Sequence, residues 1–448
     1  MDKFIGEGRL PNFKKLRDES MVFVSEAAET SPHLDPWIQW VTVHTGLDHK
    51  DHGVLQLDEG HLLDRDRVWD LVSAIGKPVW VCGSMSTRYR KPLNGYLMPD
   101  PWTTKVTPYP AELNPFFDFV RRNVQEYTRD RVPLSTSDYV SFVRFLVGHG
   151  LSMATATATV QQLLREKTKG QRWKRAVILD KLQADVFLNV FRKIRPAFST
   201  FFLNSTAHFQ HIYWRNMEPE QFDIKASDEE NVAYGDAILY GYQEMDRLLR
   251  RFTEAAGSDV TIVLATAMSQ QPCAIYEEQG GKKVYRPLDY GPVLEFAGIS
   301  RATQVSAVMS NQFHIFFETE QEANVAQEQL DALRVLDQPV LCTVREGNRL
   351  LTGAQFFGDP AQDTPIEIEG TDKKTVFFDL FYKVEGIKSG MHHPDGIFWI
   401  RTPQRHHFVA EAKVPLRTVA PTVLDLLRIG KPDYMTGESV LARMSSVV

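Results

Sequence analysis

Short apolar runs alternate along the chain with longer stretches in which apolar residues recur at helical spacing. Runs of about four to eight apolar residues are typical of strands that are buried on both faces of a sheet. This pattern predicts strands at 21–28, 77–82, 196–203, 260–266 and 396–400. Helical segments lie between these runs, and that rhythm indicates a mainly parallel sheet with crossover helices.

Several helices have clear stop signals. The predicted helices 37–46 and 66–76 end in Gly46 and Gly76, and glycine is common just after a last helical turn. The segment 234–252 predicts a long amphipathic helix, and the last predicted helix ends at Gly430.

Three further regions differ from this rhythm. Residues 84–135 are rich in Pro, Tyr and Asn, which predicts loops over one end of the sheet. Residues 136–193 have helical spacing with polar outer faces, which predicts a helical cap or outer layer. Between 300 and 358 the pattern predicts a small β-α-β insertion.

Composition narrows the class of protein. The 448 residues are 43% hydrophobic and 24% charged, and the net charge is -6, which disfavours nucleic acid or an anionic membrane as the main partner. Cys82, Cys273 and Cys342 are far apart, which disfavours a disulfide framework and fits a reducing, cytoplasmic location. No apolar run approaches the roughly 18 residues of a membrane span, and the N-terminus lacks a signal-peptide core. A small molecule is therefore the expected substrate or ligand.

One stretch carries candidate metal chemistry. In NSTAHFQHIYW, residues 204–214, His208 and His211 are three apart and follow a predicted buried strand. A His-x-x-His pair on one helical turn places both rings on one face, where they can bind a metal. The alternative is that both imidazoles form hydrogen bonds in a core, since most histidines are not ligands.

Seven segments in order resemble the alkaline phosphatase superfamily, in its branch of type I phosphodiesterases and nucleotide pyrophosphatases. The segments are EGRLPNFKKL, VTVHTGLDHKDHGV, GKPVWVC with KPLNGYLMP, STAHFQHIYW, VTIVLATAMSQQP, HHPDGIFWI and VAPTVLDLLRIGKPDYMTGESVL. The resemblance implies a three-layer α/β/α sandwich with a mostly parallel central sheet. It also implies a core divided over 1–99, 196–299 and 371–448, with a loop and helical cap at 100–195 and an α+β insertion at 300–370.

The departures from the family pattern concern its two metals. The resemblance places one metal at Ala207, His211 and His392, so the carboxylate ligand is replaced by alanine. The Asp-His pair expected for the other metal is Ala267-Met268, and the expected nucleophile falls near Asp35-Pro36, which has no hydroxyl. The family's first strand, with its metal-binding aspartate, has no counterpart, so either the natural N-terminus is longer or another segment fills that place.

At most one divalent metal, zinc or manganese, is therefore expected, at His211 and His392. A catalytic zinc normally has three protein ligands. His208, His393 or Asp35 could supply the third.

Four other side chains are candidates for a site. Asp35 can act as a base, a ligand or a nucleophile, although a helix N-cap is the plainer interpretation. Arg88 can recognise a phosphate or acidic group, or can be a surface charge. Gln270 and Gln271 follow a strand at the edge where open α/β sheets bind ligands, where they can contact a substrate or simply form a turn.

The sequence thus predicts a divergent hydrolase of a phospho- or sulfo-ester, with Asp35 and His211 as catalytic residues. The alternative is a pseudoenzyme that binds a ligand or partner without turnover, because several metal ligands and the nucleophile are lost together. A third possibility is metal-free chemistry on a carbohydrate or acyl group, with Asp35 and a histidine as the acid–base pair.

Overall fold

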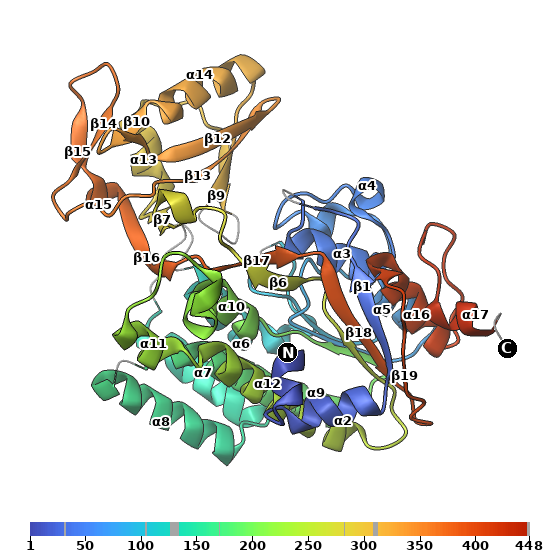
Figure 1. Cartoon of the computed structure of the whole chain (residues 1–448). Helices are drawn as coiled ribbons and strands as arrows, with labels where there is room; N and C mark the ends of the chain where they lie inside the picture. The colour runs from blue at the N-terminus through green and yellow to red at the C-terminus, as the bar shows by residue number, and fades with distance from the viewer. Residues whose placement is uncertain are drawn as a thin grey trace.

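The computed structural model describes residues 1–30, 33–103, 105–125, 134–169, 171–281, 283–307 and 312–445. Helices flank the sheets of the larger part of the molecule, and a smaller α+β part stands apart at the upper left of Figure 1. Both chain ends belong to the larger part (Figure 1).

A five-stranded sheet has β1 (Met21–Glu26) near its centre. β1 pairs in antiparallel fashion with β18 (Asp395–Arg401) and in parallel fashion with the two-residue strands β19 (Phe408–Val409) and β20 (Val414–Pro415). β5 (Ile262–Ala265) pairs with the other side of β18, again antiparallel. β1 and β5 therefore run in the same direction on either side of an opposed strand.

A second sheet is entirely parallel. β2 (Val79–Cys82) lies between β3 (Gly95–Met98) and β4 (Phe198–Phe201). Every residue of β2 is buried, as its continuous apolar run predicts. The predicted α/β class with a mostly parallel sheet is confirmed, and β18 is the exception because it opposes both of its neighbours.

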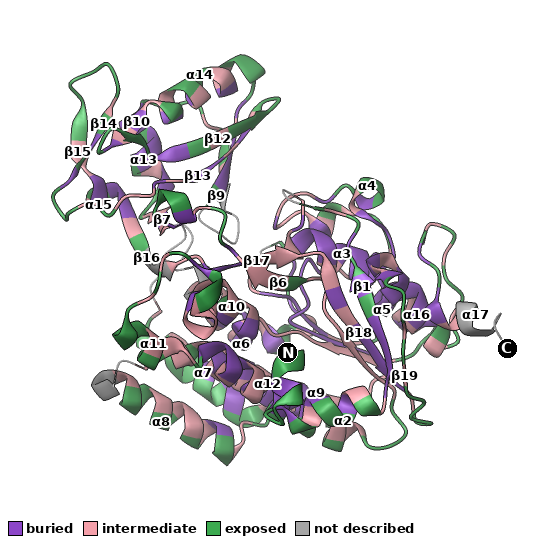
Figure 2. Cartoon of the chain, viewed as in Figure 1, coloured by how far each residue is buried: buried purple, intermediate pink, exposed green. Residues whose placement is uncertain are grey.

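Crossover helices connect these strands. α3 (Pro36–Thr45) and α5 (Val68–Ala74) lie between β1 and β2, while α9 (Ala176–Ile194) precedes β4 and α12 (Ala237–Ala256) precedes β5. α3 ends at Gly46, whose φ of 67° is in the left-handed region that glycine adopts readily. Figure 2 shows the buried faces of these helices against the sheets. The remaining helices of this part are α1 (Asp2–Gly6), α2 (Pro11–Asp18), α4 (His49–His52), α10 (Ser205–Met217), α11 (Asp228–Tyr234), α16 (Val419–Leu426) and α17 (Val440–Ser445).

Two local predictions are wrong. The region 84–135 contains β3 and the helix α6 (Asn114–Gln125) as well as loops, because Phe116, Phe117 and Val120 give α6 a buried apolar face. The last core helix does not end at Gly430: its C-cap is Leu427, and Arg428 adopts the positive φ of 58°.

The helical region comprises α7 (Thr136–Gly148), α8 (Met153–Lys169) and α9. α9 packs directly on the parallel sheet, where the Trp80 indole nitrogen donates to the Phe187 carbonyl oxygen at 3.1 Å. The Phe187 ring also contacts the Phe201 ring of β4, with centroids 5.3 Å apart. α9 therefore forms a layer on the sheet as well as part of the helical region.

The small α+β part has its own apolar core, built from residues between Tyr285 and Phe381. A two-stranded ribbon of β7 (Lys283–Pro287) and β16 (Phe381–Ile387) joins it to the rest. Its other elements are α13 (Tyr290–Ala297), β8 (Gln304–Ala307), β9 (Gln312–Phe316), α14 (Glu320–Asp331), β10 (Leu333–Val335), β11 (Gln338–Pro339), β12 (Leu341–Glu346), β13 (Arg349–Ala354), β14 (Pro365–Ile368), β15 (Lys374–Val376) and α15 (Phe377–Leu380).

Two further observations bear on the sequence predictions. Among the described residues no helix combines the length and the apolar character that crossing a bilayer requires. Cys82, Cys273 and Cys342 are all free thiols.

Candidate functional site

Four segments that are far apart in the sequence meet at one edge of the sheets. Asp35 follows β1, and α10 follows β4, so both come from the carboxyl ends of strands. β5 leads into β6 (Ser269–Pro272), which pairs with β17 (Gly390–His393) just before the opposed strand β18 begins. The carboxyl edge of an open α/β sheet is where ligands bind, so this meeting point is the candidate site.

Ser389 and Gly390 hold β17 against α10. The Ser389 amide donates to the His211 carbonyl oxygen at 2.8 Å, and its hydroxyl donates to the Ile212 carbonyl oxygen at 2.6 Å. A Cβ atom on Gly390 would lie only 2.2 Å from the Gln210 carbonyl oxygen, so the close approach requires glycine at this position. The two histidines carried by α10 and β17 are thereby fixed relative to each other.

His211 and His392 lie together, with ring centroids 5.1 Å apart. The Nδ1 atom of His211 lies 3.0 Å from the Gly390 carbonyl oxygen, and that of His392 lies 2.8 Å from the Leu34 carbonyl oxygen. A carbonyl oxygen can only accept, so the proton of each neutral ring is on Nδ1. Each Nε2 therefore keeps a lone pair that can accept a hydrogen bond or bind a metal.

Both imidazoles are uncharged at neutral pH. Burial lowers the pKa of His211 to about 3 and that of His392 to about 4, and the positive charge of Lys388 lowers both as well. The site therefore offers two acceptors rather than two cations.

Asp35 is the carboxyl group of this site. It occupies the N-cap position of α3, but its side chain makes no capping hydrogen bond. Instead its Oδ1 lies 3.8 Å from Nδ1 of His392. Burial raises the pKa of Asp35 to about 7, although the Lys388 charge opposes that shift. Asp35 is therefore the N-cap residue by position without a side-chain capping bond, and its carboxyl group is divided between acid and base forms near pH 7.

Lys388 is the cation shared by this group. Its positive charge lowers the pKa of Asp35, of His211 and of His392. No motif in the sequence points to Lys388 or Ser389, although both immediately precede the GMHH segment of β17.

Gln270 and Gln271 come from the strand paired with β17. Gln270 lies opposite His392, and its Nε2 donates to the Ala207 carbonyl oxygen at 3.1 Å, while its buried Oε1 has no hydrogen-bond partner. The Gln271 amide donates to the His392 carbonyl oxygen at 3.2 Å. Gln270 thus contacts the backbone of Ala207 and keeps an unpaired amide oxygen, and Gln271 supports β17.

Three other residues that the sequence suggested for the site are Arg88, His208 and His393. Arg88 donates to the Leu63 carbonyl oxygen and to Asp64, both at 2.6 Å, and none of these contacts involves the cluster. His208 is on α10 one turn before His211 and is exposed. His393 is paired with Ser269, and its Nδ1 accepts from the Asp395 amide at 3.2 Å.

A catalytic zinc with three protein ligands does not fit the side chains of this cluster. The described residues contain no group of three or more His, Cys, Asp or Glu side chains placed to hold a metal ion. Two neutral imidazoles with Nδ1 bonded to a carbonyl are typical of metal-binding histidines, but they are two donors where three are usual. No protein carboxylate stands at Ala207, whose carbonyl oxygen is already bonded by Gln270.

Comparisons with known proteins give matches among solved structures alone. No protein-family model and no curated protein matches the sequence. Murine ectonucleotide pyrophosphatase/phosphodiesterase 5 is 9% identical, with a TM-score of 0.43, and the match covers 98% of this chain and 94% of that one. Wild-type alkaline phosphatase PafA is 11% identical, with a TM-score of 0.43, and covers 96% of this chain and 93% of its own.

Proposed function

We propose that this protein is a divergent hydrolase of a phospho- or sulfo-ester that uses at most one metal ion. One observation carries the proposal: Asp35, His211 and His392 converge from α3, α10 and β17 around the charge of Lys388. An acid–base group with a pKa near the working pH is the most effective kind of proton carrier in catalysis. Asp35 has that property because of its burial.

Each side chain has a role in this reaction. The Nε2 atoms of His211 and His392 accept hydrogen bonds from water and hold it near Asp35. Asp35 takes a proton from that water as its oxygen bonds to phosphorus or sulfur, and the bond to the ester oxygen breaks. The Lys388 ammonium group stabilises the negative charge that develops on the non-bridging oxygens. The departing ester oxygen takes its proton from solvent.

A single divalent ion, zinc or manganese, would supply Lewis-acid polarisation of the ester if it bound to the two imidazoles. The roles of Asp35 and Lys388 do not depend on it.

The test is turnover of generic aryl phosphodiesters, phosphomonoesters and sulfate esters. The full-length protein is purified without chelator, its metal content is measured, and activity is followed with zinc, manganese or magnesium. We expect turnover by the wild type and its loss in Asp35→Asn and in His211→Ala/His392→Ala. Absence of turnover above the double variant, with every ester and metal, contradicts the proposal.

A second function is favoured by one observation, the lack of a three-ligand metal group among the described side chains. In that case the cluster binds an ester or sugar phosphate without turnover. A thermal-shift screen of nucleotides, sugar phosphates and sulfated sugars separates the two functions. A ligand that raises the melting temperature but is recovered unchanged after long incubation supports the binding protein and contradicts the hydrolase.

A further inference from the structure

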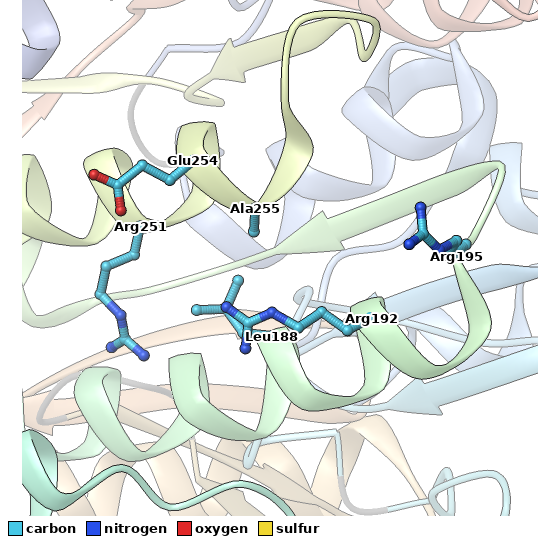
Figure 3. Close-up of a pocket in the computed structure, with 6 residues that line it drawn as sticks. All are labelled: Leu188, Arg192, Arg195, Arg251, Glu254 and Ala255. Atoms are coloured by element: carbon cyan, nitrogen blue, oxygen red, sulfur yellow. The ribbon is translucent and has the colours of Figure 1, made fainter.

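A cavity of about 460 Å³ lies at the opposite edge of the sheets, between the ends of α9 and α12. Arg192 and Arg195 line it from the end of α9, and Arg251, Glu254 and Ala255 line it from the end of α12 (Figure 3). Arg195 precedes the first residue of β4 by three positions, so the cavity is at the amino edge of that strand. The candidate site is at the carboxyl edge, and the two places are therefore distinct.

The charges around this cavity are not balanced. Lys193 pairs with Glu112 at 3.7 Å, Arg250 pairs with Glu254 at 3.8 Å, and Arg251 pairs with the buried Asp185. Among the described residues, Arg192 and Arg195 have no carboxylate partner. Both are exposed, so two guanidinium groups at the cavity are available to a ligand.

Arg195 is the C-cap of α9 with φ 43° and ψ 67°, a left-handed conformation that glycine adopts at less cost than arginine. Other non-glycine residues also have a positive φ, among them Arg405 and Arg428, so this conformation alone does not indicate a ligand. It does make Arg195→Gly a substitution that the backbone accommodates.

A helix dipole alone does not account for this arrangement. Basic side chains near helix C-termini are stabilised by the carbonyl groups of the last turn. Arg192 and Lys193 both lie in the last turn of α9, whereas the last turn of α12 holds no basic residue, so the dipole does not explain Arg251. Arg192 and Arg251 face the same gap between the two helices in Figure 3, whereas a capping role requires no common cavity.

We propose that Arg192 and Arg195, in the cavity that Arg251 also lines, form a second binding site for a small molecule that carries a phosphate group. Arginine presents a planar set of donors that matches two phosphate oxygens at once. The cavity volume is within the range of sites for small ligands, roughly 300–1,000 Å³. The site is separate from the hydrolytic cluster and does not depend on the function proposed for it.

The first test is isothermal titration of the full-length protein with inorganic pyrophosphate at constant ionic strength. We expect binding by the wild type and a dissociation constant at least about tenfold higher in Arg192→Gln/Arg195→Gln, since hydrogen bonds to charged groups are stronger than those between neutral groups. The matched control is Lys193→Gln/Arg250→Gln, which removes the same number of charges from neighbouring positions of α9 and α12 that do not line the cavity. We expect the control to change the constant by less than about threefold.

Several outcomes overturn the proposal. One is no binding by the wild type, and another is equal weakening in both double variants, which indicates the general field of a basic face. A third is loss of binding in His392→Ala with retention in Arg192→Gln/Arg195→Gln, which places the anion at the hydrolytic cluster. Tighter binding of duplex DNA than of pyrophosphate, lost in Arg192→Gln/Arg195→Gln, assigns the site to nucleic acid instead.

Arg195→Gly provides a variant that does not threaten folding. Glycine relieves the left-handed backbone, so we expect the melting temperature to rise or stay constant while pyrophosphate binding weakens at least about fivefold. A variant that is more stable and binds pyrophosphate as well as the wild type shows that Arg195 is not part of a site.

Discussion

The carboxyl and amino edges of the sheets hold polar side chains in opposite ways. At the carboxyl edge, burial leaves His211 and His392 neutral and brings the Asp35 pKa to about 7. At the amino edge, Arg192 and Arg195 are exposed and keep their charge. The first edge is suited to holding water and moving protons, and the second to holding an anion. The two edges therefore differ in how deeply they place their polar groups: the histidines and Asp35 are largely buried, whereas the two arginines are exposed.

The largest expected effect concerns proton transfer at the carboxyl edge. Asp35→Asn removes the group that accepts a proton, so we expect ester turnover to fall by about 100- to 10,000-fold. Asp395→Asn is the matched control, because Asp395 lies nearby but pairs with Lys413 at 2.7 Å outside the cluster. Steady-state kinetics with an aryl phosphate ester measures both. An equal loss in the two variants contradicts a specific role for Asp35.

The next effect concerns the rigidity of that edge. Gly390→Ala places a methyl group against the Gln210 carbonyl oxygen, so β17 must move away from α10. We expect a loss of about 1–3 kcal/mol in the free energy of unfolding, measured by urea titration, together with reduced turnover. Gly148→Ala is the control, because a Cβ atom there meets no neighbour. A stable Gly390→Ala variant shows that the close approach is not required.

The neutral histidines also predict how stability depends on pH. The folded pKa values of about 3 and 4 are below the ordinary value of 6.5, so the unfolded chain binds more protons as the pH falls. Stability from this source is complete above pH 6.5 and is lost as the pH approaches 4, by roughly 3 kcal/mol for each histidine at about 1.4 kcal/mol per pKa unit. We expect a smaller acid-induced decrease in His211→Gln/His392→Gln, measured by thermal unfolding at each pH. An unchanged decrease shows that the two imidazoles are not buried as neutral groups.

The smallest expected effect is a shift in the pH profile of turnover. Because Asp35 acts as a base, the rate should rise with pH and level off above about pH 7. The Lys388 charge lowers the Asp35 pKa, so Lys388→Ala should move the midpoint to higher pH by a fraction of a unit. Lys383→Ala is a suitable control, because Lys383 pairs with Asp359 at 2.5 Å away from the cluster. An unchanged pH midpoint in Lys388→Ala contradicts a role for Lys388 in the site.

The local pattern of the sequence was sufficient for most of the core. The continuous apolar runs of β1, β2 and β5 and the glycine stop after α3 were predicted because each depends on neighbouring residues alone. α6 was missed because prolines and aromatic residues before it resemble a loop, while its apolar face is recognised only against the core that it covers.

For the candidate site, the sequence indicated His211 and His392 as metal ligands, Asp35 as an acid–base group and Gln270 as a substrate contact. It could not show that the Asp35 carboxyl group approaches His392, since that contact joins two residues 357 positions apart in the chain. Lys388 was missed because its role comes from charge acting across space rather than from a motif. The arginine cavity was missed for a similar reason, since α9 and α12 contribute its side chains separately.

The sequence by itself determined which segments form strands and helices and which side chains can carry charge, because hydrophobic periodicity and residue chemistry are local properties. The tertiary structure decided the protonation of those side chains and their grouping. Burial at the carboxyl edge leaves two histidines neutral, and exposure at the amino edge leaves the side chains of two arginines accessible to a ligand. Both outcomes depend on solvent access, which the packing of distant segments establishes.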